Sequence, residues 1–422
     1  MLLLAYLPEI STSLLLMMMG TQVPQIGALL ILAEIGLVGL LFIFRTTTFI
    51  DVLMRWWWLL LFPVLCVLSA LWSGVPMISF RYAAQFLFTC FVGVLLARLL
   101  PPRRYLIVLM ISLFIFCILC ILNGRTGSSF SRWVLIGLTG SKNQMAYAAQ
   151  LLMLSGVAVL LMRSIIPQIK LMALAALPLS IYLVAGTDSS TAILMSVGGT
   201  LVLAGLWFSE RLPPGGRLGA IFAGALILAP ITLLLPEIHA FIDHFVFDTL
   251  GKDPTLTGRT ILWERADALI ARRPLLGYGF QAIWMGDSVD TIGLKRLADI
   301  EDGRQFHFHN HFRIAAVDTG LIGLATFVGA MVAVGLAAIR QVLLRPSVET
   351  SFFAILFALM VARAFTDQII GPFNMHTLLY FAACVYAFWK PEPAMQTAGV
   401  PAWQPPNRFG VRAPRLGPGF RQ

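Results

Sequence analysis

The sequence predicts an all-α, polytopic integral membrane protein with about twelve transmembrane helices and one long loop outside the membrane. The 422 residues are 59% hydrophobic and 12% charged, with a mean hydropathy of +0.85, whereas soluble proteins are about 45–50% apolar and about 25% charged. The net charge of +10 would suggest a nucleic-acid partner in a soluble chain. In a membrane protein, basic residues gather first at the cytoplasmic ends of the spans. We therefore expect no nucleic-acid partner.

Apolar windows are the second reason for this fold class. A hydrocarbon core of about 30 Å requires about 20 apolar residues in a helix. Twelve windows meet this requirement, at residues 1–20, 25–44, 56–73, 82–99, 105–122, 144–163, 168–186, 190–208, 218–236, 312–339, 351–366 and 373–389.

The distribution of basic residues predicts the orientation of these spans. Short cytoplasmic loops carry an excess of Lys and Arg, and with the N-terminus inside, 16 of the 30 basic residues fall on that side. Both termini are then cytoplasmic. Four regions follow: helices one to nine in residues 1–236, an outer loop domain in 237–310, helices ten to twelve in 311–390, and a tail in 391–422. The tail is rich in Pro, Gly and Arg, so we expect it to be disordered.

The outer loop is predicted to contain a helix from about Gly258 to Arg273. Thr257 is a suitable N-cap, and Pro274 and Gly277 end the helical pattern. Arginines and leucines recur along it at helical spacing. This pattern is typical of a helix that lies on a membrane surface.

The stretch Phe306–Gly323, FHFHNHFRIAAVDTGLIG, has the densest chemistry. An imidazole with a pKa near 6.5 can accept a proton from a sugar hydroxyl at neutral pH. His307, His309 and His311 could equally be interfacial aromatics. We expect no metal site, because alternate residues converge only on a strand and no Cys, Asp or Glu has ligand spacing. Gly320 and Gly323 predict close packing of the following helix on a neighbour.

One further ion pair is expected near the outer end of a later span. Arg363 and Asp367 are one helical turn apart, so the simplest interpretation is that they pair with each other.

Four motifs give the chain a family resemblance. They are H-N-x9-G-x-x-G from His309 to Gly323, T-G-R-x-x-L-W from Thr257 to Trp263, P-L-L-G-Y-G-F from Pro274 to Phe280, and G-S-K-N from Gly140 to Asn143. With these motifs, the span plan and the long late loop, the chain resembles the O-antigen ligase and Wzy (ExoQ-type) polysaccharide polymerase superfamily.

This resemblance implies a GT-C-type, inverting, metal-independent glycosyltransferase without a cofactor. It would move a glycan from undecaprenyl diphosphate to an acceptor hydroxyl on the periplasmic side of a bacterial inner membrane. His309 matches the family's base, and Arg259 and Arg265 match positions expected to hold the diphosphate. Arginine suits this task because its planar fork matches phosphate. Further expected substrate contacts are Lys142, Asn143, Arg81, Asn310 and Trp263, although Lys142 and Arg81 could instead be interfacial cations.

Three functions remain open from the sequence. The first is a polymerase that joins undecaprenyl-diphosphate-linked repeat units to an acceptor glycan. The second is a ligase that transfers finished glycan to lipid A core or to a protein. The third is a lipid-linked sugar flippase or transporter, which predicts charged residues along the interior of the spans. The motif G-S-K-N and the Pro-rich tail favour the polymerase. In all three cases the chain has membrane lipid and a lipid-linked glycan as partners.

Overall fold

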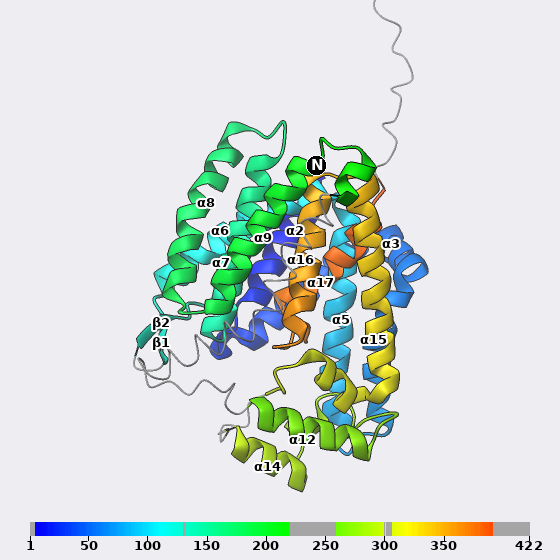
Figure 1. Cartoon of the computed structure of the whole chain (residues 1–422). Helices are drawn as coiled ribbons and strands as arrows, with labels where there is room; N and C mark the ends of the chain where they lie inside the picture. The colour runs from blue at the N-terminus through cyan, green and yellow to red at the C-terminus, as the bar shows by residue number, and fades with distance from the viewer. Residues whose placement is uncertain (1–4, 130–131, 220–258, 299, 301–305, 391–422) are drawn as a thin grey trace, which may run out of the picture. The chain divides into compact units, whose positions relative to one another are not determined.

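The computed structural model describes residues 5–129, 132–219, 259–298, 300 and 306–390. In these residues the chain is helical apart from one hairpin of β1 (Thr126–Ser129) and β2 (Arg132–Leu135), which pair antiparallel (Figure 1). The α-helices are α2 (Leu7–Gly20), α3 (Gly27–Trp56), α4 (Leu61–Leu68), α5 (Pro76–Leu99), α6 (Pro102–Asn123), α7 (Lys142–Leu161), α8 (Pro167–Gly186), α9 (Ser190–Ser209), α12 (Arg259–Arg272), α13 (Ala282–Met285), α14 (Val289–Leu297), α15 (His311–Leu344), α16 (Val348–Ala364) and α17 (Met375–Tyr386). The short 3-10 helices are η1 (Pro24–Ile26), η2 (Trp57–Leu60) and η3 (Ser69–Leu71).

Seven helical segments of the described residues are long and apolar enough to cross a membrane. They are Pro24–Leu71, Pro76–Leu99, Pro102–Asn123, Lys142–Leu161, Pro167–Gly186, Ala192–Ser209 and His311–Leu344. The chain is therefore a polytopic membrane protein, as its composition predicts.

The helices follow the predicted windows, with differences in length. Windows 25–44 and 56–73 fall on one helical run, Pro24–Leu71, which bends where Arg45 leaves helical geometry (φ −138°, ψ 33°). Windows 1–20 and 373–389 fall on helices of only 14 and 12 residues, shorter than the about 20 residues that cross a bilayer. The window 218–236 lies largely outside the described residues. The count of twelve spans and the GT-C arrangement stay predictions.

Five of the described helices, α7, α14, α15, α16 and α17, begin with a side-chain cap. Ser141 accepts a hydrogen bond from the backbone N–H of Gln144 at α7, and Asn310 accepts one from Arg313 at α15. Asn374 does the same at α17. Such caps contribute about 0.5–2 kcal/mol each. A helix N-terminus carries partial positive charge, so each of these starts is favourable for a nearby anion.

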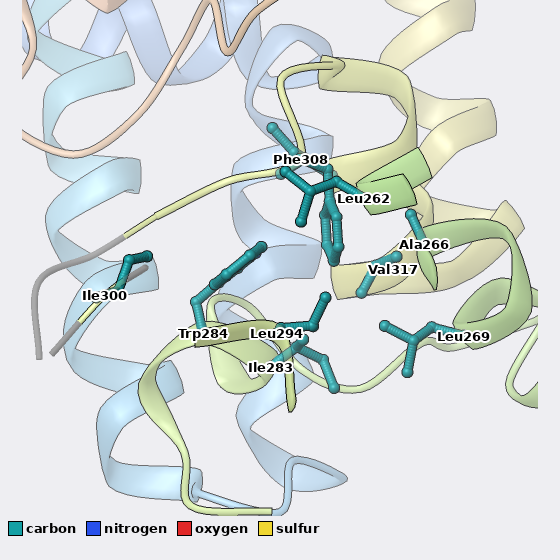
Figure 2. Packing of buried hydrophobic residues seen from close by; sticks show 10 residues of the cluster. Leu262, Ala266, Leu269, Ile283, Trp284, Leu294, Ile300, Phe308 and Val317 are labelled. Carbon is teal, nitrogen blue, oxygen red and sulfur yellow. The ribbon is translucent and has the colours of Figure 1, made fainter. Parts of the chain in front are cut away.

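Helices α12, α13 and α14 and the start of α15 share a small hydrophobic core (Figure 2). Leu262, Ala266 and Leu269 of α12 point into it, toward Trp284 and Val317. Helix α12 begins and ends close to the predicted Gly258 and Arg273, while Thr257 lies outside the described residues. The expectation of a membrane-surface helix is corrected here, because the apolar stripe of α12 packs on protein.

Gly320 and Gly323 predict a continuous helix that packs closely on a neighbour. In the structure, α15 is instead broken at Gly320. Gly320 has φ 67° and ψ −170°, a region that is essentially restricted to glycine. The loop of residues 274–279 fills the break: Tyr278 and Gly279 donate backbone hydrogen bonds to the carbonyls of Val317 and Asp318 (both 2.9 Å), and Leu321 donates one to Pro274 (2.7 Å). The motifs P-L-L-G-Y-G-F and G-x-x-G are therefore two halves of one backbone contact.

Candidate active site

The histidine segment is anchored by Phe308. Its ring is buried (1% exposed) and lies 5.0 Å from that of Trp284. Its carbonyl accepts a hydrogen bond from Nε1 of Trp263 at 2.8 Å. Burial of such a ring contributes about 1.5–3 kcal/mol. The ring of Phe308 lies in the core of α12 to α15, whereas the side chains of His307 and His309 lie outside that core and are partly exposed.

His307 and His309 converge on one carboxylate. Their ring centroids are 4.3 Å apart. Nε2 of His307 and Nδ1 of His309 lie 3.6 Å and 3.7 Å from Oδ1 of Asp367. His309 has a left-handed backbone (φ 50°), which costs about 1–2 kcal/mol for a side chain of this kind. Strain of this type gathers at functional sites, and here it accompanies the convergence of the two rings.

The two histidines differ in which nitrogen is available. Nδ1 of His307 accepts a hydrogen bond from the backbone N–H of His309 at 3.1 Å. A neutral imidazole has one accepting nitrogen, so the proton of neutral His307 is on Nε2, toward Asp367. His309 turns Nδ1 to Asp367 and keeps Nε2 on the other edge of a ring that is 22% exposed. His309 is therefore the better placed of the two to accept a proton from a ligand.

Arg363 holds Asp367 from the opposite side. Its Nη2 donates to Oδ2 of Asp367 at 2.9 Å, and only 6% of its side chain is exposed. The guanidinium lies over the ring of Tyr147, 3.1 Å from its centroid, and that ring is 5.4 Å from His376. The predicted Arg363–Asp367 pair is thus confirmed. It is also part of a larger cluster, the Asp367 cluster: His307, His309, Asp367, Arg363, Tyr147 and His376.

Helix α12 joins this cluster through its first residue. Nη1 of Arg259 donates to the carbonyl of Thr366 at 3.2 Å, directly before Asp367. Further along α12, Asp267 makes a two-pronged ion pair with Arg313 at 2.8 Å and 2.9 Å. Paired contacts of this geometry are among the stronger protein ion pairs. They fix α12 against the start of α15, next to the histidine segment.

Burial sets the direction of the pKa shift of His307, whereas charged neighbours set that of Asp367. Burial lowers the pKa of His307 to about 4, with the neighbouring His309 adding to the effect, so His307 is neutral at pH 7. Burial alone raises the pKa of Asp367, but His309 and Arg363 outweigh it and hold that pKa well below its usual range. Asp367 therefore stays ionised beside a neutral His307.

A metal ion also has possible ligands here. The ligand atoms of His307, His309 and Asp367 all lie within 4.8 Å of one another. The prediction that no acidic residue joins the histidines was wrong, because the fold brings Asp367 to them from the segment after α16. The charges oppose a cation, however. Arg363 already pairs with Asp367, and the positive charge of Arg259 reaches His307. The arrangement suits an anion next to a neutral base.

Two comparisons with known proteins indicate the family to which this chain is similar. A profile of the O-antigen ligase family matches residues 174–328. The chain is also 26% identical over 333 residues to the exopolysaccharide production protein ExoQ of Rhizobium meliloti (strain 1021), which covers 77% of this chain and 76% of that one. Both comparisons support the O-antigen ligase and Wzy polymerase superfamily as the family of this chain. Members of this superfamily are polysaccharide polymerases or ligases. The comparisons therefore support an enzymatic function for this chain.

The O-antigen ligase profile covers only part of the cluster. Its match includes α12 and both histidines but ends before Arg363 and Asp367. Sequence reasoning identified His309 and Arg259, and the structure brings both to the cluster. It missed the link of Asp367 to the histidines, and the contribution of Tyr147 and His376. A polar pair at the end of an otherwise apolar span was the one signal for Asp367.

Two other predicted site residues, Asn310 and Trp263, bond to backbone groups of the protein. Asn310 uses Oδ1 to cap α15 and Nδ2 to bind the carbonyl of Phe365 at 3.0 Å, so it positions the segment. Trp263 likewise holds Phe308. A direct substrate contact by either residue has no support in these bonds. Both act on the backbone that carries His309.

The remaining predicted site residues divide into two groups. Lys142 and Asn143 occupy the first turn of α7, about one and a half turns before Tyr147, at the same end as the cluster. Arg265 is exposed on α12, and Arg81 is exposed on α5, 5.7 Å from the ring of Tyr82. Among the described residues, the structure brings neither Arg265 nor Arg81 to Asp367.

Proposed function

We propose that this chain is a polysaccharide polymerase that joins undecaprenyl-diphosphate-linked repeat units at the periplasmic face of a bacterial inner membrane. The transfer is inverting and metal-independent, and His309 is its base. One observation supports this most: Nδ1 of His309 faces the ionised Asp367 while the opposite edge of its ring is free to meet a hydroxyl.

The reaction is a single displacement. Nε2 of His309 takes the proton of the acceptor hydroxyl as its oxygen forms a bond to the anomeric carbon. The bond from that carbon to the diphosphate oxygen breaks, and its electron pair leaves with the undecaprenyl diphosphate. Asp367 stabilises the imidazolium of His309 until the proton passes to solvent. Attack opposite to the leaving group inverts the anomeric centre.

The leaving diphosphate is stabilised by positively charged side chains and helix N-termini and not by a metal ion. Arg363 neutralises Asp367, so Arg259, beside the cluster, is the arginine that is available to the donor. The N-termini of α7 and α17 add positive dipoles, because Tyr147 and His376 bring their first turns together. Lys142 begins α7 and is placed to meet the same diphosphate.

The membrane arrangement is part of the proposal. Twelve spans in a GT-C-like arrangement, with both termini in the cytoplasm, place residues 237–310 outside. The cluster then faces the periplasm, where lipid-linked repeat units are joined. The alternation of the described helices supports this orientation, since α7 begins and α16 ends at Asp367 while their other ends lie together near Arg163 and Glu349.

Two alternatives differ in acceptor or class. A ligase would use the same residues and pass its glycan to lipid A core or a protein. The printed name of the relative, an exopolysaccharide production protein, favours the polymerase. A flippase would need charged groups along the span interiors. In the described residues, the buried charged side chains are Glu34, Asp318 and Arg363, and Arg363 belongs to the cluster.

The test is transfer by the purified chain in liposomes with a synthetic undecaprenyl-diphosphate repeat unit. His309→Ala should reduce polymer formation by at least about 100-fold, with the yield of folded protein unchanged. Asp287→Ala, an exposed acid, is the control. Wild-type activity in His309→Ala would show that His309 is not the base. Activity should survive EDTA, and a loss that zinc restores would support the metal alternative. Deletion of the gene separates polymerase from ligase: single units still attached to the surface indicate a polymerase, and polymer on the lipid carrier indicates a ligase.

A further inference from the structure

A second charged cavity lies at the ends of the helices opposite the Asp367 cluster. Its volume is about 570 Å³, within the 300–1,000 Å³ typical of ligand pockets. The end of α7, the end of α9 and the start of α16 contribute to its wall. Helix α7 has 20 residues, so this cavity is about 30 Å from the first turn that faces the cluster. Its charged lining residues are Arg103, Arg163, Arg211, Arg217, Glu210 and Glu349.

Two of the four arginines have structural roles. Nη2 of Arg103 donates to the carbonyls of Arg163 (2.6 Å) and Ser164 (2.8 Å) after α7. Arg217 donates to the carbonyl of Leu343 at 2.7 Å, near the end of α15. Carbonyls at helix ends lack partners within the helix. These two side chains supply the missing donors and hold the wall of the cavity in place.

Arg163 and Arg211 are not used in this way. Both are exposed and line the cavity. Cζ of Arg211 lies over the ring of Trp207, 4.3 Å from the ring centroid, and the side chain stays exposed. Across the described ranges, the hydrogen bonds and ion pairs of the protein include no acceptor for either guanidinium. Two cavity-lining arginines without a protein acceptor can donate to a phosphate.

The cavity keeps a positive balance despite its two acids. Four arginines face Glu210 and Glu349, and Glu349 is within 3.9 Å of Arg103. Burial, and then the like charge of Glu349, raises the pKa of Glu210, so its negative charge is weakened. Ser347 caps the N-terminus of α16 at the same wall, which adds partial positive charge. Each contribution favours an anionic occupant.

We propose that this cavity binds a phosphate group through Arg163 and Arg211. The apolar lining residues Leu161, Met162 and Val348 suit the glycerol and upper acyl region of a phospholipid. Basic pockets between membrane helices bind anionic head groups in this way. A soluble phosphate has the same recognition chemistry. The experiment separates these two sources.

The experiment uses the full-length chain purified in detergent, with two double variants. The cavity variant is Arg163→Gln with Arg211→Gln. The control is Arg45→Gln with Arg340→Gln, which removes two exposed arginines outside the cavity. Native mass spectrometry measures binding of phosphatidylglycerol and of diacylglycerol, which lacks the phosphate. Thermal unfolding measures stabilisation by inorganic phosphate. Neither readout depends on glycan transfer, so failure here is distinct from failure of the proposed function.

Phosphatidylglycerol binding that is at least about tenfold weaker in the cavity variant alone supports the proposal with a lipid source. Stabilisation by inorganic phosphate that is lost in the cavity variant alone supports it with a soluble source. The proposal is overturned if neither probe binds the wild type, if both double variants lose binding equally, or if diacylglycerol binds as tightly as phosphatidylglycerol.

Discussion

Nδ1 of His309 lies 3.7 Å from Oδ1 of Asp367, and Arg363 holds the other oxygen of the same carboxylate at 2.9 Å. The histidine is thereby oriented by an anion that is itself fixed. At 3.7 Å the contact is longer than a hydrogen bond. A small shift of the imidazole would close it when a substrate is bound, and catalytic hydrogen bonds commonly tighten in this way.

Asp367→Asn is the first prediction that follows from this relationship. The amide keeps the shape but loses the charge that stabilises the imidazolium of His309. We expect the kcat of glycan transfer to fall by about 100-fold or more, with little change in the KM for the donor, by analogy with carboxylates that orient a catalytic histidine. Asp290→Asn, which breaks an exposed pair with Arg272 on the loop, is the matched control. An unchanged kcat in Asp367→Asn would show that the charge of Asp367 does not assist His309 in catalysis.

Arg259 and Arg265 are expected to differ, although the sequence motif suggests both. Arg259 contacts the residue before Asp367, whereas Arg265 is exposed. Arg259→Ala should raise the KM for the diphosphate donor by at least about tenfold, the effect of losing one charge-assisted hydrogen bond. Arg265→Ala should change it by less than about threefold. Initial rates at varied donor concentration measure both. A large effect in Arg265→Ala would mean that the donor extends along α12.

The helices of this chain were predictable because apolar length and cap residues are local signals. Pro274, for example, marks the end of α12 within two residues of itself. His309 was also nominated from a local motif. None of these conclusions requires knowledge of which helices are neighbours.

The rest of the site depends on contacts between distant segments. The spacing of Arg363 and Asp367 shows that they can pair, but it does not show that the pair faces His307 and His309. The convergence of the histidines accompanies the left-handed backbone at His309, which alternation along a strand does not predict. Gly320 has the appearance of a packing glycine until its partner, the loop of residues 274–279, is known.

The low pKa of His307 predicts a pH-dependent contribution to stability. Burial lowers that pKa from its ordinary 6.5 to about 4. Between these values the unfolded chain binds a proton that the folded His307 does not, so this group's contribution to the free energy of unfolding falls as the pH falls from 6.5 to 4. Below about 4 it stops changing.

His307→Gln should remove this dependence. The side chain of His307 is 24% exposed, which screens part of the effect, so we expect about 1–2 kcal/mol less destabilisation between pH 7 and pH 4.5 than in the wild type. Reversible unfolding in mixed detergents at the two pH values measures the difference. If the wild type and His307→Gln lose the same free energy, the pKa of His307 is the same in the folded and the unfolded protein.

Gly320→Ala tests whether the break in α15 holds the site together. At φ 67° and ψ −170° an alanine is strained, by about 1–3 kcal/mol, and its Cβ would collide with the carbonyl of Leu275. Because the loop of residues 274–279 bonds to this break, we expect the free energy of unfolding to fall by about 3 kcal/mol or more. Gly329→Ala is the matched control: it lies on the same helix with no neighbour within 4 Å and should change stability by no more than about 1 kcal/mol. Thermal unfolding in detergent compares the two variants. Equal unfolding temperatures would mean that the loop does not depend on the break, and that His309 is positioned by Phe308 and Asn310 alone.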